Sequence, residues 1–115
     1  MPQGPLTIET LPGPQPNSAT LRLHGPLLVN NLFRLRDTLQ SSDAPLLVID
    51  LADVPYMDSG GLGVLINGYV SRQNRGRRIA FIAPSPSVKA LMKMTRVDSV
   101  LPIFDSVDQV KVASA

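Results

Sequence analysis

The sequence contains no cysteine among its 115 residues. It therefore cannot form a disulfide framework, a thiolate metal site or a cysteine nucleophile, and this absence favours a reducing, intracellular compartment. Long hydrophobic runs are also missing: the run 46–49 falls far short of the roughly 20 residues needed to cross a bilayer. The opening residues, MPQGPLTIET, have no basic region and no long apolar run, unlike a secretory signal. We expect a cytoplasmic protein with no membrane insertion.

Histidine and aromatic residues are scarce, which weakens two classes of site. The only histidine, His24, would have to converge on Ser59 from a distant element to form a catalytic triad, and no GxSxG motif surrounds that serine. We interpret His24 as a strand-end residue. No aromatic residue lies within the arginine-rich segment 72–78 to stack on bases. We interpret that segment as a basic helix end that complements the helix dipole, with no direct nucleic-acid contact.

Nucleotide and metal motifs are missing as well. The stretch SGGLG at 59–63 has neither the GxxxxGK[ST] spacing with its lysine nor the GxGxxG fingerprint. Asp50, Asp53 and Asp58 are the nearest approach to a carboxylate cluster. Strand alternation, however, places Asp50 at a strand end and Asp58 in a loop, outside one ligand shell. We expect no cofactor, no metal and no enzymatic activity.

Period-two alternation and short apolar runs predict the strands. Residues 6–11 and 18–23 alternate, and the turn-forming segment PGPQPN joins them, which predicts an antiparallel hairpin at a sheet edge. The apolar run 46–51 predicts a strand buried on both faces in mid-sheet. Residues 79–83 form another short buried strand, and 100–104, interrupted by Pro102, an edge strand.

Helical periodicity fills the intervals. The first predicted helix carries leucines at 28, 32, 35 and 39, with Asn30 or Asn31 as its cap. The second, ended by Gly76, has a wide apolar stripe at 62, 65, 66, 69 and 70. The third is capped by Ser85 with Pro86 at its first position, and its inner face lies at 88, 91, 92 and 95. Residues 106–110 begin a fourth.

This order of elements predicts one α/β domain spanning residues 1–115. We expect a mixed four- to five-stranded sheet with an N-terminal antiparallel hairpin, covered by about four helices. From Leu46 onward, strands and helices alternate, which requires parallel pairing through right-handed crossovers. A chain of 115 residues is long enough for a single core.

The junction Asp58-Ser59-Gly60-Gly61 stands between the central strand and the second helix. The amides of residues 59–62 are expected at the positive end of the helix dipole, which favours an anion. The two glycines remove bulk and would let another backbone or an active site approach Ser59. Two interpretations stay open: an ordinary helix cap worth about 1 kcal/mol, or a hydroxyl presented for modification.

The stretch LLVIDLADVPYMD followed by SGGLGVLINGYV strongly resembles the STAS domain of bacterial anti-sigma factor antagonists, a SpoIIAA-like fold. In that family, the serine after the aspartate of the motif Asp-Ser-[Ser/Thr]-Gly-Leu-Gly is phosphorylated by a partner kinase. Asp58, Ser59 and the segment 61–63 fit this motif. Gly60 replaces its second hydroxyl, and Gly-Pro-Leu-Leu at 25–28 replaces the common Gly-x-Leu-Asp.

The resemblance implies a non-enzymatic regulator in the partner-switching control of transcription. Unphosphorylated, it would bind an anti-sigma factor serine/threonine kinase and release the sigma factor, and phosphorylation at Ser59 would abolish this binding. A serine phosphatase is a further implied partner. The implied partner-binding residues are Asp58, Ser59, Gly60, Gly61 and Leu62. The two departures keep an alternative open: a non-phosphorylated STAS scaffold or transporter-associated interaction module.

The third helix offers a possible extension of this surface. Lys89, Met92 and Lys93 would widen it if the second and third helices pack on the same face of the sheet. The alternative places Met92 in the core and both lysines in solvent, because methionine commonly fills core gaps. The whole assignment requires an exposed Ser59, because a buried oxygen could not be read by another macromolecule.

Overall fold

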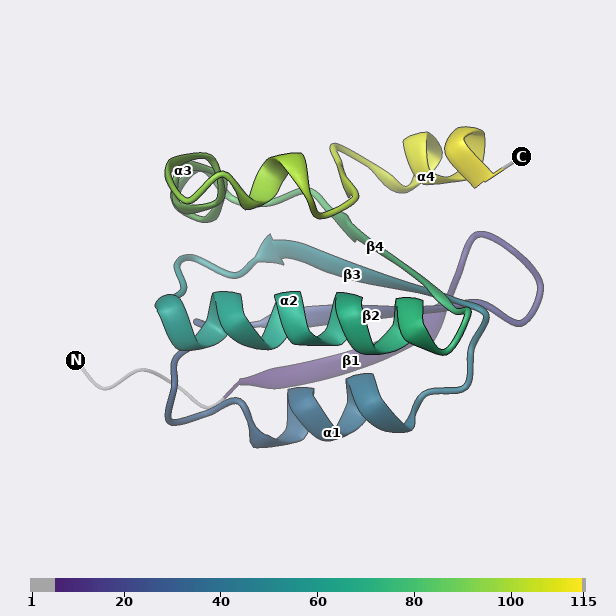
Figure 1. Cartoon of the computed structure of the whole chain (residues 1–115), viewed down its shortest axis with the longest axis horizontal. Coiled ribbons are helices and arrows are strands. Elements are labelled where there is room, and N and C mark those ends of the chain that lie inside the picture. The colour runs from purple at the N-terminus through teal and green to yellow at the C-terminus, as the bar shows by residue number, and fades with distance from the viewer. Residues whose placement is uncertain (1–5, 115) are drawn as a thin grey trace.

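The computed structural model of this chain describes residues 6–114, with side chains described as far as residue 110. Figure 1 shows a sheet with helices on both sides. The elements are β1 (Thr7–Pro12), β2 (Ala19–His24), α1 (Phe33–Ser41), β3 (Leu46–Asp53), α2 (Ser59–Asn74), β4 (Arg78–Ile82), α3 (Pro86–Met94), the 3-10 turn η1 (Val97–Ser99), β5 (Ile103–Phe104) and α4 (Val107–Ser114).

The five strands form one sheet in the order β1-β2-β3-β4-β5. β1 and β2 pair antiparallel, and every other neighbouring pair is parallel. β3 lies in the middle, and its residues Leu46 to Leu51 are all buried. The predicted N-terminal hairpin, the mixed sheet and the doubly buried central strand are therefore confirmed.

Alternate residues of the central strands enter two separate cores. Leu47 and Ile49 join the larger core, which contains Leu35 of α1 and Leu65 of α2. Leu46 and its alternating neighbours belong to a smaller core with residues of α4. The side-chain period of two thus places α1 and α2 on one face of the sheet and α4 on the other, as Figure 1 shows.

Helix α1 begins at Phe33, later than the leucine spacing predicts, and the predicted asparagine cap is wrong. The N-cap position is Leu32, which makes no side-chain cap hydrogen bond. Instead, the side-chain nitrogen of Asn31 donates to the Pro26 carbonyl, and its side-chain oxygen accepts from the Leu28 backbone amide, both at 3.0 Å. The Asn31 side chain therefore closes the preceding loop. The backbone groups of that loop compete with the first turn of the helix for hydrogen bonds to this side chain.

The buried face of α2 is rotated relative to the predicted stripe. Leu62 and Leu65 are buried as expected, but Val70 is 46% exposed. Gly61, Val64, Gly68 and Arg72 complete the buried face. A Cβ on Gly68 would lie 2.9 Å from Leu39 Cδ1, so α1 packs closely against α2 at this glycine. The predicted stripe misses Gly68 and Arg72 because neither has an apolar side chain, and it also misses the apolar Val64.

Arg72 is fully buried, and two arginines of the segment 72–78 bind other parts of the fold. The Arg72 guanidinium donates to the carbonyl oxygens of Ser42, Ala44 and Arg78. Burial lowers the pKa of Arg72, and the charges of nearby arginines lower it further. Arg77 pairs with Asp43 at 2.6 Å. Arg72 and Arg77 are thus held by other parts of the fold, whereas Arg75 and Arg78 are exposed.

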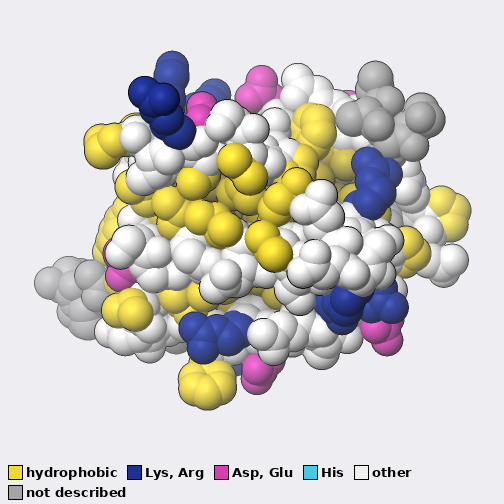
Figure 2. Space-filling model, in the orientation of Figure 1, with side chains coloured by type: hydrophobic (Ala, Val, Ile, Leu, Met, Phe, Trp, Pro, Cys, Tyr) yellow, Lys and Arg dark blue, Asp and Glu magenta, His cyan; other side chains and the backbone are white. Residues whose placement is uncertain are grey.

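The cap of the third helix and the edge position of the last strand follow the sequence prediction, but Thr95, predicted on the inner face, is exposed at the C-cap, and the strand is shorter than the predicted 100–104. Ser85 caps α3 by accepting from the Val88 amide, and Pro86 is the first helical residue. β5 has only two residues, directly after Pro102, and lies at the sheet edge beside β4. Figure 2 shows a band of hydrophobic side chains between α2 and the α3–η1 segment, where the larger core reaches the surface. Partly buried side chains that pack on this core include Ile66, Tyr69, Leu91, Val97 and Ile103.

The helices of the described residues differ from membrane-spanning helices in length or polarity. α2, with 16 residues, carries the buried Arg72 near its end. Within residues 6–114, no helix combines the length and apolar character that a bilayer span requires.

Candidate functional site

The predicted junction lies where β3 passes through a short loop into α2, at one end of the sheet (Figure 1). Met57 in this loop pairs with Leu27 in an isolated parallel bridge, and the Asp58 amide donates to the Leu27 carbonyl at 3.0 Å. Asp58 is the N-cap of α2, with extended backbone, and Ser59 is the first helical residue. The Ser59 side chain is exposed, as the assignment requires.

The Asp58 carboxylate joins two distant segments of the chain. Its Oδ1 accepts from the Gly61 amide at 2.9 Å, which is the helix cap, and its Oδ2 accepts from the Val29 amide at 2.9 Å. These amides, that of Val29 foremost, lower the pKa of Asp58 below its ordinary value of 3.8. Asp58 is therefore anionic at neutral pH, and both of its oxygens are already engaged in holding the loop before α1 to the start of α2.

The two glycines of the junction pack against the chain itself. A Cβ on Gly61 would lie 2.4 Å from the Leu27 carbonyl oxygen, and a Cβ on Gly60 would lie 2.8 Å from Val29 Cβ. The sequence interpretation, in which these glycines leave room for a visiting backbone, needs correction: the loop that carries Leu27 and Val29 fills that room.

Burial divides the predicted partner-binding residues. Ser59 is exposed and Asp58 and Gly60 are half-buried, whereas Gly61 is buried and Leu62 is 6% exposed. The prediction that Gly61 and Leu62 contact a partner therefore needs correction. These two buried residues support the exposed part of the site. Their burial follows from their place on the inner face of the first turn of α2.

Met92 also needs correction, because it is 1% exposed and belongs to the larger core. Packing against the sheet leaves no side-chain surface for a partner. Lys89 and Lys93 are both exposed, and the Lys89 ammonium lies 3.8 Å from an Asp105 carboxylate oxygen, beyond β5. A docking role for Lys89 stays a prediction.

Three exposed apolar side chains lie on the segments that meet at Ser59. Val29 is 74% exposed, Phe33 at the start of α1 is 76% exposed, and Tyr56 in the loop before α2 is 39% exposed. We call Ser59 together with Val29, Phe33 and Tyr56 the Ser59 surface. Sequence reasoning missed the three apolar residues. The sequence did contain a signal for two of them: Val29 and Phe33 are apolar residues outside the leucine spacing that marks the buried face of the predicted helix.

The alternative catalytic and metal groups are engaged elsewhere. His24 ends β2, as predicted, and its two ring nitrogens lie 3.0 Å from Glu9 and 2.9 Å from Asp53. The hydrogen bond to Glu9, aided by the charge of Asp53, raises the pKa of His24. Asp50 accepts from Arg22 at 3.1 Å. Asp50, Asp53 and Asp58 thus have three different sets of partners. Among the described residues, no group of acidic and imidazole side chains could hold a metal ion.

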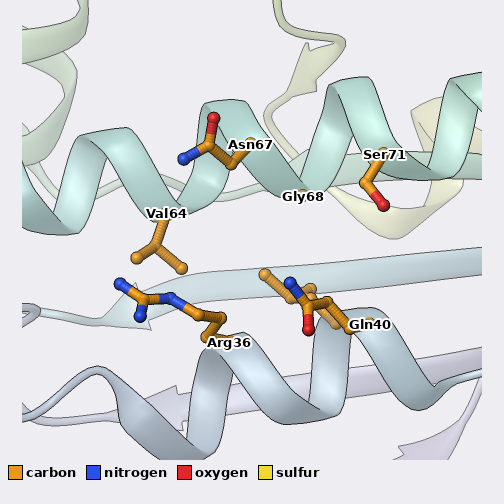
Figure 3. A pocket seen from close by; sticks show the side chains of 7 residues that line it. Arg36, Gln40, Val64, Asn67, Gly68 and Ser71 are labelled. Atoms are coloured by element: carbon orange, nitrogen blue, oxygen red, sulfur yellow. The ribbon is translucent and has the colours of Figure 1, made fainter.

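A cavity of about 210 Å³ lies between α1 and α2, further along α2 than Ser59 (Figure 3). Its floor is made by Leu39, Val64 and Gly68, and its polar lining is Arg36, Gln40, Asn67 and Ser71. No acid–base pair lines it, so the cavity contains no group poised for general acid–base chemistry.

Comparisons with known proteins agree with the resemblance in the sequence. Over 74 residues the chain is 27% identical to an anti-sigma F factor antagonist from Paenibacillus polymyxa, an alignment that covers 64% of this chain and 63% of that protein. The chain thus spans less than two thirds of that relative's length. Anti-sigma factor antagonists are non-enzymatic regulatory proteins, in agreement with the expected absence of enzymatic activity.

Solved structures share the fold. The chain is similar to an anti-sigma factor antagonist from Mycobacterium paratuberculosis, with a TM-score of 0.80 at 20% identity over 94% of this chain and 92% of the other. It is also similar to unphosphorylated SpoIIAA (TM-score 0.74, 14% identity, 92% and 93% covered). For the phosphorylated form of SpoIIAA, from Bacillus, the TM-score is 0.68 at 13% identity, and the match covers 94% of this chain and 98% of SpoIIAA. The fold is therefore SpoIIAA-like.

A family model for the STAS domain matches residues 7–110, which include the whole smaller core, all of the larger core except Leu6, and the whole Ser59 surface. By this match over nearly its entire length, the chain belongs to the STAS domain family.

Proposed function

We propose that this protein is an anti-sigma factor antagonist controlled at Ser59. In its unphosphorylated form it binds an anti-sigma factor serine/threonine kinase in the cytoplasm and so releases the sigma factor. Phosphorylation of Ser59 abolishes the binding, and a serine phosphatase restores it. The observation that carries this proposal is the exposed Ser59 hydroxyl at the first turn of α2, within the motif of the family.

The Ser59 surface has the composition of a docking site. Exposed aromatic and aliphatic side chains at the centre of an interface supply much of its binding energy when a partner desolvates them. Val29, Phe33 and Tyr56 are such side chains. Val29 contacts both neighbours of Ser59, by its amide to Asp58 and by its side chain to Gly60. A partner that covers Val29 would therefore also cover the serine. We place Lys89 at the edge of the proposed surface.

A phosphate at Ser59 would reverse this binding by charge and bulk. It adds about −1.5 to −2 charges beside the Asp58 carboxylate, which is already anionic at neutral pH. Burying that charge in an apolar interface without a cationic partner is unfavourable. The start of α2 itself tolerates the group, because the helix dipole favours an anion there. The switch therefore acts on the interface and leaves the fold intact.

Phosphate transfer tests the proposal directly. The protein is incubated with ATP and each candidate anti-sigma factor kinase from its own organism, and the modified residue is mapped by mass spectrometry. We expect one phosphate, on Ser59, which Ser59→Ala removes. Ser87→Ala is the matched control, since Ser87 is also an exposed serine in the first turn of a helix.

Binding measured by calorimetry completes the test. We expect Ser59→Ala to retain affinity for the kinase and Ser59→Asp to lose about 100-fold, equivalent to about 2.7 kcal/mol. Equal affinity for both variants, with no phosphate at Ser59, would refute the switch. That result would favour the alternative of a constitutive STAS scaffold or transporter-associated module.

A further inference from the structure

Two contacts hold Val29 against the first turn of α2, one on each side of Ser59. Before the serine, the Asp58 carboxylate accepts from the Val29 amide at 2.9 Å. After it, Gly60 packs against the Val29 side chain. The loop that carries Val29 and the helix that carries Ser59 therefore form one continuous surface.

The second contact exists only because residue 60 has no side chain. A Cβ at this position would lie 2.8 Å from Val29 Cβ, 3.0 Å from Val29 Cα and 3.1 Å from Val29 Cγ2. Two of these atoms are fixed to the backbone, and a β-branched side chain has little freedom at χ1. Any larger residue at 60 must therefore displace the loop. Gly63, one turn further along α2, differs: a Cβ there would meet nothing within 4 Å.

We propose that Gly60 and Val29 form a steric latch that determines partner specificity by fixing the shape of the Ser59 surface. Val29 packs one side on Gly60 yet remains 74% exposed, so most of its side chain is available to a partner. The position of Val29 thus depends on the absence of a side chain at residue 60. The specificity part of this inference rests on the proposed function, whereas the latch itself does not.

Hydrogen exchange at the residue-29 amide measures the latch without any partner. Protection factors are determined by NMR for the wild type, Gly60→Ala, Gly63→Ala, Val29→Gly and the double variant Val29→Gly/Gly60→Ala. We expect Gly60→Ala to lower protection roughly five- to tenfold, because the displaced loop loses its hydrogen bond to Asp58. Gly63→Ala, the matched control, should leave protection unchanged.

The double variant tests whether the two residues act as a pair. In the Val29→Gly background the contacts with Val29 Cβ and Cγ2 no longer exist and only the 3.0 Å approach to the Cα of residue 29 remains, so Gly60→Ala should lower protection clearly less than in the wild-type background. Equal effects in both backgrounds, or no effect of Gly60→Ala in the wild-type background, would overturn the latch. Circular dichroism checks folding: rescue of an unfolded Gly60→Ala by Val29→Gly would support the latch, and failure of both to fold would overturn it.

Affinity for the anti-sigma factor kinase identified by phosphate transfer to Ser59, compared with affinity for the other candidate kinases, tests specificity. Gly60→Ala should weaken that complex about tenfold, and Gly63→Ala should not, in parallel with the exchange data. Equal affinity of both variants would refute the role in specificity even if the latch is present. If no kinase binds the wild type, the proposed function and the specificity role fail together, and the exchange data still decide whether the latch exists.

Discussion

A single carboxylate, that of Asp58, organises the site. It accepts one amide from its own helix and one from Val29, 29 positions earlier in the chain. The carboxylate offers each amide an oxygen of its own, whereas serine has one oxygen and the second polar atom of an asparagine amide is a donor. Asp58 is thus both a helix cap and a tertiary contact.

Replacing Asp58 tests this double role. Asp58→Asn keeps one acceptor and loses the other, so we expect a loss of about 1 kcal/mol in the free energy of unfolding at neutral pH, and Asp58→Ala should lose about 2 kcal/mol. Both values are measured by urea denaturation. A loss for Asp58→Asn equal to that for Asp58→Ala would show that the two amides are not served separately.

The same carboxylate predicts a pH dependence. The pKa of Asp58 is lowered in the folded state, so its contribution to stability is fully present above the ordinary pKa of 3.8 and disappears as the pH falls through the folded-state value. NMR titration of the Asp58 carboxyl carbon should give a midpoint below 3.8. A midpoint at or above that value would contradict the two hydrogen bonds.

Helix α2 is anchored at both ends by polar side chains that its hydrophobic stripe does not predict. Asp58 holds the first turn to the loop before α1, and Arg72 in the last turn holds the loop after α1 and the start of β4. Between them, Gly68 lets the helix lie against Leu39. The position of Ser59 relative to the sheet therefore depends on contacts along the whole helix.

The anchor at Arg72 can be tested by Arg72→Met, which keeps the apolar stem and removes the donors. Because three part-buried carbonyl oxygens would lose their partners, we expect the free energy of unfolding to fall by about 2–4 kcal/mol in chemical denaturation. The control is Arg75→Met, an exposed residue that donates to the Gln40 carbonyl, for which we expect a change within about 0.5 kcal/mol. Similar losses in both variants would show that burial of Arg72 contributes nothing specific.

The molecule as a whole is a sheet with helices on both faces that carries its candidate switch at one end (Figure 1). Ser59 lies outside both cores, and the exposed side chains of Val29 and Phe33 lie outside them too. A modification there changes the charge of the surface without entering the packed interior. The proposed switch is therefore a change in what the surface can bind.

This arrangement predicts that phosphorylation leaves the fold stable. The attraction between phosphate and the α2 dipole, typically 0.3–1 kcal/mol, opposes repulsion by Asp58. We expect the free energy of unfolding of the phosphorylated protein to lie within about 1 kcal/mol of the unmodified protein. Thermal denaturation of matched samples, before and after phosphatase treatment, measures the difference. A much larger loss would mean that the switch acts by unfolding.

The sequence alone determined the order of elements, the central strand and the exposed serine after an aspartate. Those predictions succeed because they depend on local information: a period of two or of 3.6, a proline or glycine at a boundary, and the residue types that favour a cap. The start of α1 was misplaced for the same reason. Leucine spacing continues to Leu28, whereas the Asn31 side chain closes the loop at that point.

Only the tertiary structure decided what the other junction residues do. It brought Val29 beside Asp58 and Gly60, filled the space above the glycines with the chain's own loop, and placed Met92 in the core. It also buried Arg72, a charge that composition alone assigns to the surface. These outcomes depend on contacts between segments far apart in the chain, where packing and hydrogen-bond satisfaction override the preferences of single residues.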